Sequence, residues 1–358
     1  MTPMTFSPLS TKRPFWKRAL VTGGAGFLGS YLCERLLGSG VEVDGVDNLS
    51  SGSADNVRHL ADHPGFRLLE LDLADPDCPD ALVAPYDLVL HLAGPASPAD
   101  CGHRALETLD VASRGTSNAL TVADRDGARF LLASASQVYG DPLTHPQRED
   151  YWGNVDPVGP RSAHDESKRF SEALTTAYVS ANGTDAGIVR LFNTYGPRMR
   201  ADGPQAIPTF IKQALAGRAV TIEGDGSQTR ALCYVDDVVD ALLMVAASRS
   251  VRPVNIGGGD ETTVREIARR VIGLTGSDSR VEFVDRREDD PVRRRPDTTF
   301  VRELYGWTPK VTWEEGFKRT IAYFAELPDD ARRTPDPYKR PGGLFPRPEG
   351  GIRHACSW

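Results

Sequence analysis

The sequence contains no long hydrophobic run, and no apolar stretch approaches the roughly 20 residues that a helix needs to cross a bilayer. It is poor in cysteine: there are five in 358 residues, and none are in C-x-x-C spacing. It also lacks an excess of positive charge, because its formal net charge is -7 at pH 7. We therefore expect no membrane insertion, no disulfide framework, no metal site and no nucleic-acid partner.

The two ends of the chain show no periodic apolar pattern. Residues 1–16 contain Pro3, Pro8 and Pro14 and lack the apolar core of a secretory signal, so we predict an irregular arm. Residues 326–358 are rich in Pro, Gly and Arg, which predicts a tail with little structure of its own. The odd number of cysteines, with no spacing typical of a disulfide framework or a zinc site, fits a reducing cytoplasm best.

Apolar runs alternate with helical patterns through the first half of the chain. Six runs are typical of buried parallel strands, namely residues 18–24, 41–47, 66–72, 88–94, 129–136 and 186–193. Residues 29–40 and 105–127 lie between such runs, have helical apolar spacing and end at glycine, as crossover helices do. This alternation predicts an α/β fold with a doubly wound parallel sheet of the Rossmann type.

The pattern changes near residue 193 to loops rich in Gly and Pro, followed by amphipathic segments at 264–276 and 313–327. We predict two interlocked domains. Residues 17–192 and 231–258 would form the dinucleotide-binding domain, and residues 193–230 and 259–325 would form a smaller C-terminal substrate domain.

A glycine-rich turn follows the first predicted strand and opens a helix. Gly23, Gly26 and Gly29 leave room for a pyrophosphate to approach the backbone, and the helix N-terminus meets its charge. Phe27 and Leu28 lie in the same turn. The three glycines alone would also fit an ordinary strand-to-helix turn, so other residues must indicate whether this turn binds a cofactor.

Asp47 ends the second strand, where a carboxylate can accept hydrogen bonds from both ribose hydroxyls and would repel a 2′-phosphate. NAD is therefore predicted in preference to NADP. Further cofactor-binding positions follow the second, third and fourth strands: Asn48, Asp72, Leu73, Leu92 and Ala93. Asp72, and His91 directly before Leu92, could also be simple polar residues at strand ends without a role in cofactor binding.

Several longer motifs make the chain resemble the extended short-chain dehydrogenases that act on nucleotide sugars. They are "YGDP", "YWGNVDPVGPRS", "RLFNTYGPRM", "GDGSQTRALCYVDD" and "DDPVRRRPD". Within this group the chain is most similar to the UDP-glucuronate decarboxylases, over about residues 17–325.

The resemblance implies a reaction, a substrate and an assembly. With NAD, a UDP-sugar would be oxidised at C4 and would then lose carbon dioxide, because a carbonyl β to the carboxylate lets the departing electrons form an enolate. The product would be UDP-4-keto-pentose or, after reduction, UDP-xylose. Relatives pair the helices corresponding to about residues 103–123 and 162–182 into a four-helix bundle, which implies a homodimer.

The resemblance also implies the site residues, and here the chain departs from the family. Where the family has Thr-Ser-Glu before "VYG", this chain has Ala135, Ser136 and Gln137. The family's Tyr-x-x-x-Lys pair becomes His164 and Lys168, so Ser136, Gln137, His164 and Lys168 are the implied catalytic positions. Lys168 would also bind the nicotinamide ribose. The implied substrate-binding residues are Asn193, Arg198, Arg230 and Tyr139.

His164 and Lys168 are four residues apart in a predicted helix at 162–181, so they share one face. An imidazole has a pKa near 6.5 and is neutral at pH 7, so His164 can serve as the base in place of the phenol. Tyr139 and Tyr195 are alternative bases, with expected places in the pocket wall. Alternatively, His164 is a polar residue without a catalytic role, and the oxidation at C4 is severely impaired.

Two other functions remain open at this stage. The loop "DGPQAIPTFI" looks more like that of sugar epimerases, which favours a C4 epimerase or a 4-oxidase. The altered catalytic positions would also fit a catalytically silent NAD-binding protein. A 4,6-dehydratase is disfavoured, because Gln137 cannot act as a general acid or base.

Overall fold

The computed structural model describes residues 16–95, 101, 104–203, 205–286 and 291–328, so most of the predicted arm and tail lies outside the described residues. Its largest sheet has seven parallel strands in the order β11-β6-β5-β4-β1-β2-β3. These strands are β1 (Arg18–Thr22), β2 (Glu42–Asp47), β3 (Phe66–Glu70), β4 (Leu88–His91), β5 (Arg129–Ala135), β6 (Ala186–Leu191) and β11 (Val254–Ile256). The predicted doubly wound α/β fold is confirmed.

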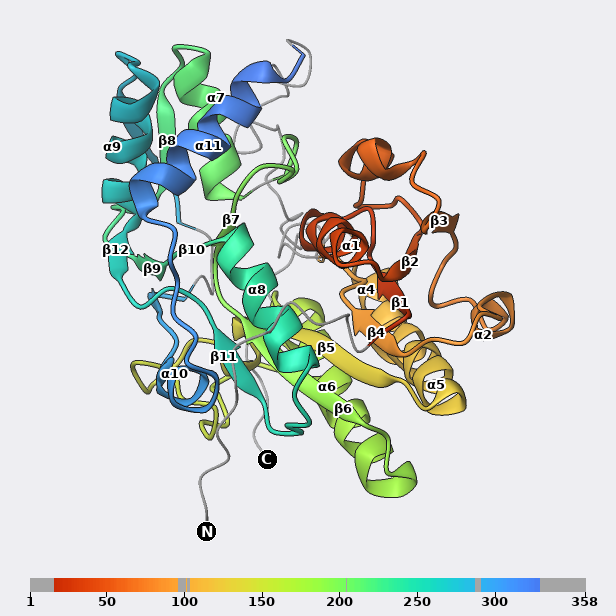
Figure 1. The fold of residues 1–358 in the computed structure, drawn as a ribbon. Helices are drawn as coiled ribbons and strands as arrows, with labels where there is room; N and C mark the ends of the chain where they lie inside the picture. Colours follow the sequence, from red (N-terminus) through yellow and green to blue (C-terminus); the bar gives the residue numbers. More distant parts are fainter. Residues whose placement is uncertain (1–15, 96–100, 102–103, 204, 287–290, 329–358) are drawn as a thin grey trace.

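Helices cover both faces of this sheet (Figure 1). On one face lie α1 (Phe27–Gly38) and α8 (Val235–Ala246), and on the other lie α4 (Ala105–Asp110), α5 (Thr116–Asp126) and α6 (Ser162–Asn182). A short helix, α2 (Cys78–Ala81), follows β3. The strand order reverses at β1, which pairs with both β2 and β4, and in such folds ligands bind beyond the carboxyl ends of the strands at this point.

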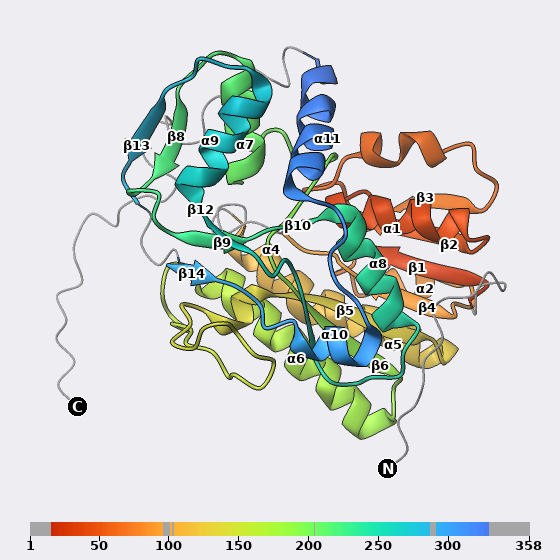
Figure 2. The same cartoon turned by 60° about the vertical axis from the view of Figure 1, so that its left-hand side comes forward.

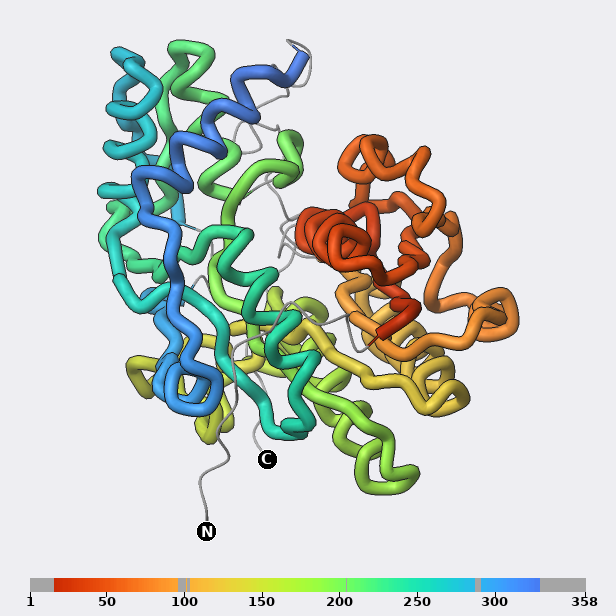
Figure 3. Tube along the Cα trace, in the orientation of Figure 1, coloured from red at the N-terminus to blue at the C-terminus, as the bar shows by residue number. Residues whose placement is uncertain are grey.

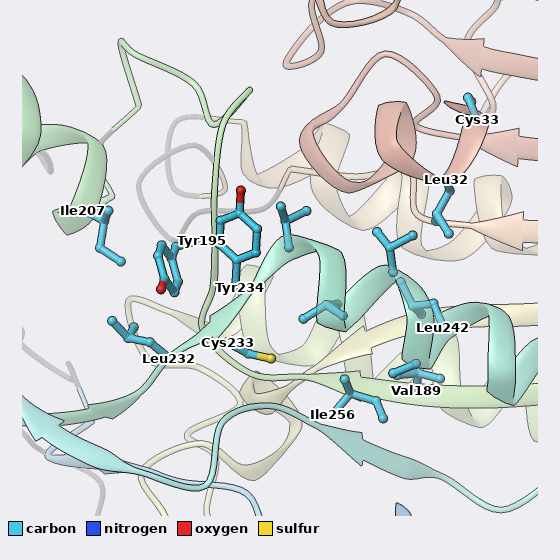
Figure 4. Packing of buried hydrophobic residues seen from close by; sticks show 14 of the residues in the cluster. Leu32, Cys33, Val189, Tyr195, Ile207, Leu232, Cys233, Tyr234, Leu242 and Ile256 are labelled. Atoms are coloured by element: carbon cyan, nitrogen blue, oxygen red, sulfur yellow. The ribbon is translucent and has the colours of Figure 1, made fainter. Parts of the chain in front are cut away.

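The strands carry apolar side chains on both faces, because successive residues point to opposite sides of a sheet. Leu20 belongs to the core beneath α5, whereas its neighbour Val21 belongs to the core shared with α1 and α8. In Figure 4, Leu242 of α8 lies close to Val189 of β6 and Ile256 of β11. Because both faces of the sheet are buried, the sequences of its strands are nearly continuous hydrophobic runs.

A smaller unit lies beside the sheet (Figure 2). Its helices are α7 (Ala206–Leu215), α9 (Val264–Thr275) and α11 (Trp313–Glu326), which pack beside the parallel pair β8 (Val220–Glu223) and β13 (Val281–Val284). A three-stranded sheet is formed by β9 (Thr229–Ala231), β12 (Glu261–Thr263) and β14 (Arg293–Arg294). A separate parallel pair is formed by β7 (Thr194–Tyr195) and β10 (Cys233–Tyr234).

The chain passes between the two units several times, as the tube in Figure 3 shows. It leaves β6 for α7 and returns for α8 and β11, and it leaves again for α9. Helix α10 (Thr299–Tyr305), which falls in the predicted substrate segment 259–325, packs against β11 of the large sheet. The last helix of the described residues, α11, lies in the smaller unit.

The predicted helix at 105–127 contains a wide turn. Residues Val111–Gly115 form a π-type segment between α4 and α5, so this stretch is one continuous but irregular helical region. Insertions of this kind occur often beside functional sites. Here Val111 contributes to the cleft described below.

Two further observations concern the predicted membrane and cysteine features. Within the described ranges, no helix has the length and apolar character needed to span a membrane. Cys33, Cys78, Cys101 and Cys233 form no disulfide within the part of the chain that the structure describes, and all four are buried.

Candidate active site

A cleft of about 360 Å³ lies beyond the carboxyl ends of β1, β2, β4 and β5, where β1 changes partners. The structure brings every predicted cofactor-binding residue to its wall: Gly23, Gly26, Phe27, Leu28, Gly29, Asp47, Asn48, Asp72, Leu73, Leu92, Ala93 and Lys168. Ser136, Gln137, His164 and Asn193 line the same cleft. One cavity therefore joins the predicted cofactor path to the predicted catalytic positions.

The glycine turn fits a pyrophosphate. Gly23 has a φ of 71°, a conformation that side chains disfavour, and a Cβ at Gly29 would overlap the carbonyl oxygen of Gly23. Gly26 is the N-cap residue of α1 and has no side chain that could cap the helix, so the amides of the first turn are left for a ligand. Asn56 holds the turn from outside by donating to the carbonyl oxygen of Ala25 at 2.9 Å.

Two carboxylates are fixed at the next strand ends. Asp47 accepts hydrogen bonds from the backbone amides of Ala25 (3.1 Å) and Leu49 (2.9 Å). Burial raises the pKa of Asp47, and these two hydrogen bonds act against that rise. Asp72 accepts from the Asn48 side chain at 3.2 Å and from the amide of Ala74 at 2.8 Å. Both acids are oriented before any ligand binds.

His91 supports the cleft from behind and does not line it. Its Nδ1 lies 2.8 Å from the Thr22 hydroxyl, and its Nε2 lies 3.1 Å from the Thr116 hydroxyl. The Thr22 oxygen also accepts from the amides of Leu92 and Ala93, both at 3.2 Å. Burial, assisted by the charge of Lys168, lowers the pKa of His91 to about 3, so the ring stays neutral and ties the loop after β4 to β1 and α5.

His164 and Lys168 lie one turn apart on α6, and both line the cleft. His164 is only 3% exposed, and its Nδ1 is 3.1 Å from Oδ1 of Asp165. Burial lowers the pKa of His164, so the imidazole is neutral at neutral pH. Burial also lowers the pKa of Lys168, whose ammonium donates to the carbonyl oxygen of Ala133 at 3.4 Å.

Three buried polar atoms of the cleft have no hydrogen-bond partner among the described residues. They are Oε1 of Gln137, Nδ2 of Asn193 and Oε1 of Gln205. Buried polar atoms are nearly always paired in folded proteins, because an unpaired one loses its hydration without compensation. The cleft therefore offers both a donor and acceptors to a polar ligand beside Ser136 and His164.

The two alternative phenols lie outside this cleft. Tyr139 is buried, donates to Asn255 at 2.8 Å and accepts from Arg190 at 2.9 Å, and burial raises its pKa to about 12. Tyr195 packs in the core beside Tyr234 (Figure 4), and burial raises its pKa as well. Neither phenol therefore lines the wall of this cleft.

Two predicted substrate arginines also lie away from the cleft wall. Arg198 has a φ of 67°, stacks over Tyr31 and pairs with Glu34 at 2.6 Å. It thus ties the loop after β7 to α1. Arg230 of β9 donates to the carbonyl oxygens of Thr229 and Pro291. Of the four residues expected to bind substrate, only Asn193 lines the cleft.

Several lining residues escaped the sequence analysis: Ser50, Ser51, Asn56, Thr194, Met199, Arg200 and Gln205. A usable signal existed for the first three, because "NLSSGSADN" is a polar stretch directly after the strand that ends in Asp47. Thr194 begins the short strand β7, and Met199, Arg200 and Gln205 lie between β7 and α7.

Comparison with known proteins agrees with this geometry. Residues 19–257 match the model of the "NAD dependent epimerase/dehydratase family". Among curated proteins, UDP-glucuronic acid decarboxylase 1 of Danio rerio is 45% identical over 86% of this chain and 73% of its own length. UDP-glucuronic acid decarboxylase 6 of Arabidopsis thaliana is 44% identical over 87% of this chain and 90% of its own length.

Solved structures show the same fold with ligands bound. The UDP-glucose 4-epimerase of Thermotoga maritima with UDP-glucose superimposes with a TM-score of 0.80 at 30% identity, covering 86% of this chain and 99% of that one. The UDP-glucose 4-epimerase of Thermus thermophilus in complex with NAD gives 0.76 at 28% identity, covering 86% and 99%. With a family model matched over most of its length and a cleft that fits the family's cofactor, the chain belongs to the NAD-dependent epimerase/dehydratase family.

Proposed function

We propose that this chain is an NAD-dependent UDP-glucuronate decarboxylase. The observation that carries the proposal is the convergence of His164, Lys168, Ser136 and Gln137 in the cleft that also holds the glycine turn and Asp47. The identity of 45% with a UDP-glucuronic acid decarboxylase over 86% of the chain supports the choice of substrate. The product would be UDP-4-keto-pentose, UDP-xylose or both.

Some cleft residues would bind the cofactor, and others would act on the sugar. When bound, NAD supplies the hydride acceptor for oxidation at C4. The glycine turn and α1 would hold its pyrophosphate, Asp47 its adenosine ribose and Lys168 its nicotinamide ribose. His164 would take the proton of the C4 hydroxyl.

Loss of carbon dioxide requires hydrogen-bond donors from the remaining side chains but no strong acid. The leaving group is neutral, so no acid has to protonate it, and only the enolate oxygen requires hydrogen-bond donors. The Ser136 hydroxyl and the Gln137 amide can donate to this oxygen although neither is a strong acid. Replacement of the family's glutamate by Gln137 is therefore compatible with decarboxylation.

A product assay tests the proposal. The purified protein is incubated with UDP-glucuronate and NAD, and the nucleotide sugars are analysed by mass spectrometry. We expect a product that has lost carbon dioxide. A new isomer of unchanged mass would instead indicate a 4-epimerase, which the identity of 30% with a UDP-glucose 4-epimerase makes the second candidate. Bound NAD with unchanged sugar would contradict both.

We also propose a homodimer in a reducing, cytoplasmic compartment. Leu106 and Leu109 of α4 and Phe170 of α6 are 80%, 41% and 50% exposed, and an apolar surface of this kind is typical of an association site. The four buried cysteines that form no disulfide among the described residues suit a compartment that keeps cysteines reduced.

A further inference from the structure

We propose that Asp165 is a positioning residue for His164. The carboxylate would hold the imidazole in the tautomer that carries its proton on Nδ1, which leaves Nε2 as the proton acceptor. The catalytic part of this inference rests on the proposed function, whereas the tautomer and orientation of His164 do not depend on any substrate.

The geometry places the two side chains together in the protein interior. Nδ1 of His164 lies 3.1 Å from Oδ1 of Asp165, and the side chains are 3% and 8% exposed. Arg161, one turn earlier, approaches the other carboxylate oxygen of Asp165 at 3.7 Å. The acid is thus held between a cation and the ring, and the ring is in turn held at the cleft wall.

The need for such a partner follows from the replacement of a phenol by an imidazole. A phenol has one reactive oxygen, whereas an imidazole has two nitrogens, and in the neutral ring only one of them can accept a proton. If Nδ1 were the acceptor, it would face a carboxylate without a proton between them. A hydrogen bond from Nδ1 to Asp165 removes this state and selects Nε2.

The surrounding charges set the strength of this base. Burial lowers the pKa of His164, Asp165 raises it, and the cations Arg161 and Arg294 of β14 lower it. Lys168 lies one turn away on the same helix. Asp165 is the only carboxylate in this set, so it offsets the burial and the cations and stabilises the imidazolium that forms when the proton arrives.

The proton transfer balances without another group. The O–H bond of the sugar hydroxyl breaks, and a bond from Nε2 to hydrogen forms. The proton on Nδ1 remains in place, so the positive charge of the imidazolium faces the Asp165 carboxylate.

The first test needs neither substrate nor activity. In protein labelled with ¹⁵N-histidine, the resonances of His164 are assigned by comparison with His164→Gln, and its tautomer and pKa are measured by NMR. We expect the Nδ1–H tautomer in the parent. Asp165→Ala should lose the dominance of this tautomer and should lower the pKa of His164, because an opposing negative charge is gone.

The second test is the pH profile of NADH formation in a single turnover with UDP-glucuronate. Asp165→Asn should lower the plateau rate roughly 10²-fold or more, towards the level of His164→Ala, and should move the acid limb to lower pH. A purely structural role would lower the rate without moving this limb. Asp240→Asn on α8, which removes an exposed ion pair with Arg35 of α1, is the matched control and should behave as the parent does.

The two tests separate the possible failures. An unchanged tautomer and pKa of His164 in Asp165→Ala would overturn the inference, whatever the activity. If the parent forms no NADH with UDP-glucuronate, the proposed function fails, and the NMR measurement still decides whether Asp165 orients His164.

Discussion

His164 and Lys168 lie one turn apart on α6 and would have different tasks under the proposed function. Burial lowers the pKa of both, so His164 is held in the neutral form that accepts protons, and Lys168 is a desolvated donor with a single weak bond at 3.4 Å. A phenol would need the lysine to lower its pKa towards neutrality, whereas an imidazole does not. Under the proposed function, Lys168 would therefore serve as a ligand for the ribose and would not be needed to activate the base.

Asp47 should set the choice between NAD and NADP. Its buried carboxylate already accepts two backbone amides, and a 2′-phosphate would add like charge beside it. We expect Asp47→Ala to reduce the preference for NAD by roughly tenfold or more, as measured by calorimetric titration with both cofactors. Asp55→Ala, which removes an exposed carboxylate paired with Arg58, is the control. Tighter binding of NADP than NAD by the parent protein would refute the role of Asp47.

At the scale of single residues, the sequence predicted positions fixed by the backbone better than positions reached by long side chains. The glycine turn and the strand-end residues all line the cleft, because strand ends in a parallel sheet meet at one edge. Arg198 and Arg230 do not, because Glu34 and two carbonyl groups engage their guanidinium groups elsewhere. No local sequence pattern reveals those competing partners.

At the scale of elements, a chain of polar contacts through His91 connects β1, β4 and α5 behind the cofactor path. The Thr22 hydroxyl accepts from two amides, so it must donate to Nδ1 of His91, and Nε2 of His91 then donates to Thr116. Thr116 continues to Ser171 of α6 at 3.1 Å. These contacts fix the backbone at Leu92 and Ala93 without occupying the cleft.

This buried histidine should make the protein less stable in mild acid. The folded-state pKa of His91 is about 3, whereas an unfolded histidine titrates near 6.5, so the unfolded chain takes up the proton first as the pH falls. Stability is therefore fully present above about pH 6.5 and decreases below it, by up to about 1.4 kcal/mol per pH unit until about pH 3. Urea unfolding at about pH 7.5 and about pH 5.5 measures the slope.

The comparison that isolates His91 uses a neutral replacement. His91→Gln should be less stable than the parent at the higher pH but should lose less stability between the two pH values, because the titrating group is gone. His63→Gln, at an exposed position, should keep the slope of the parent. Equal slopes in His91→Gln and the parent would show that His91 is not responsible.

The elements found from the sequence were those with long or two-sided apolar patterns. Helix α6 matches its predicted start and ends before Gly183, whose φ of 75° suits the left-handed cap that glycine favours. Strand β11 was missed because only Val254, Asn255 and Ile256 are strand residues, and a glycine run follows them. Such a short strand is stabilised by its pairing with β6 and not by a local preference.

At the scale of the whole molecule, long-range hydrogen bonds join helix α8 to the segment that leads into the smaller unit's last described helix, α11. Asp237 of α8 accepts the backbone amides of Lys310 and Val311 at 3.0 and 2.9 Å, and the Trp307 side chain donates to its carbonyl oxygen at 3.1 Å. These bonds anchor the segment between α10 and α11 to the large sheet's helix layer. The position of α10 against β11 could not be predicted from local sequence, because it depends on contacts between residues far apart in the chain.

The assembly proposed above can be tested on the exposed face of α4 and α6. Leu106 and Phe170 are large apolar side chains at 80% and 50% exposure, so burying this face against its copy removes apolar surface from water on both partners. Light scattering at micromolar concentration should give a homodimer for the parent and a monomer for the double variant Leu106→Glu/Phe170→Glu, because the substitution would bury unpaired carboxylates in the interface. Val83→Glu is the control, since Val83 is 81% exposed but lies after α2, away from this face. A monomeric parent, or a double variant that remains dimeric, would contradict the proposed interface.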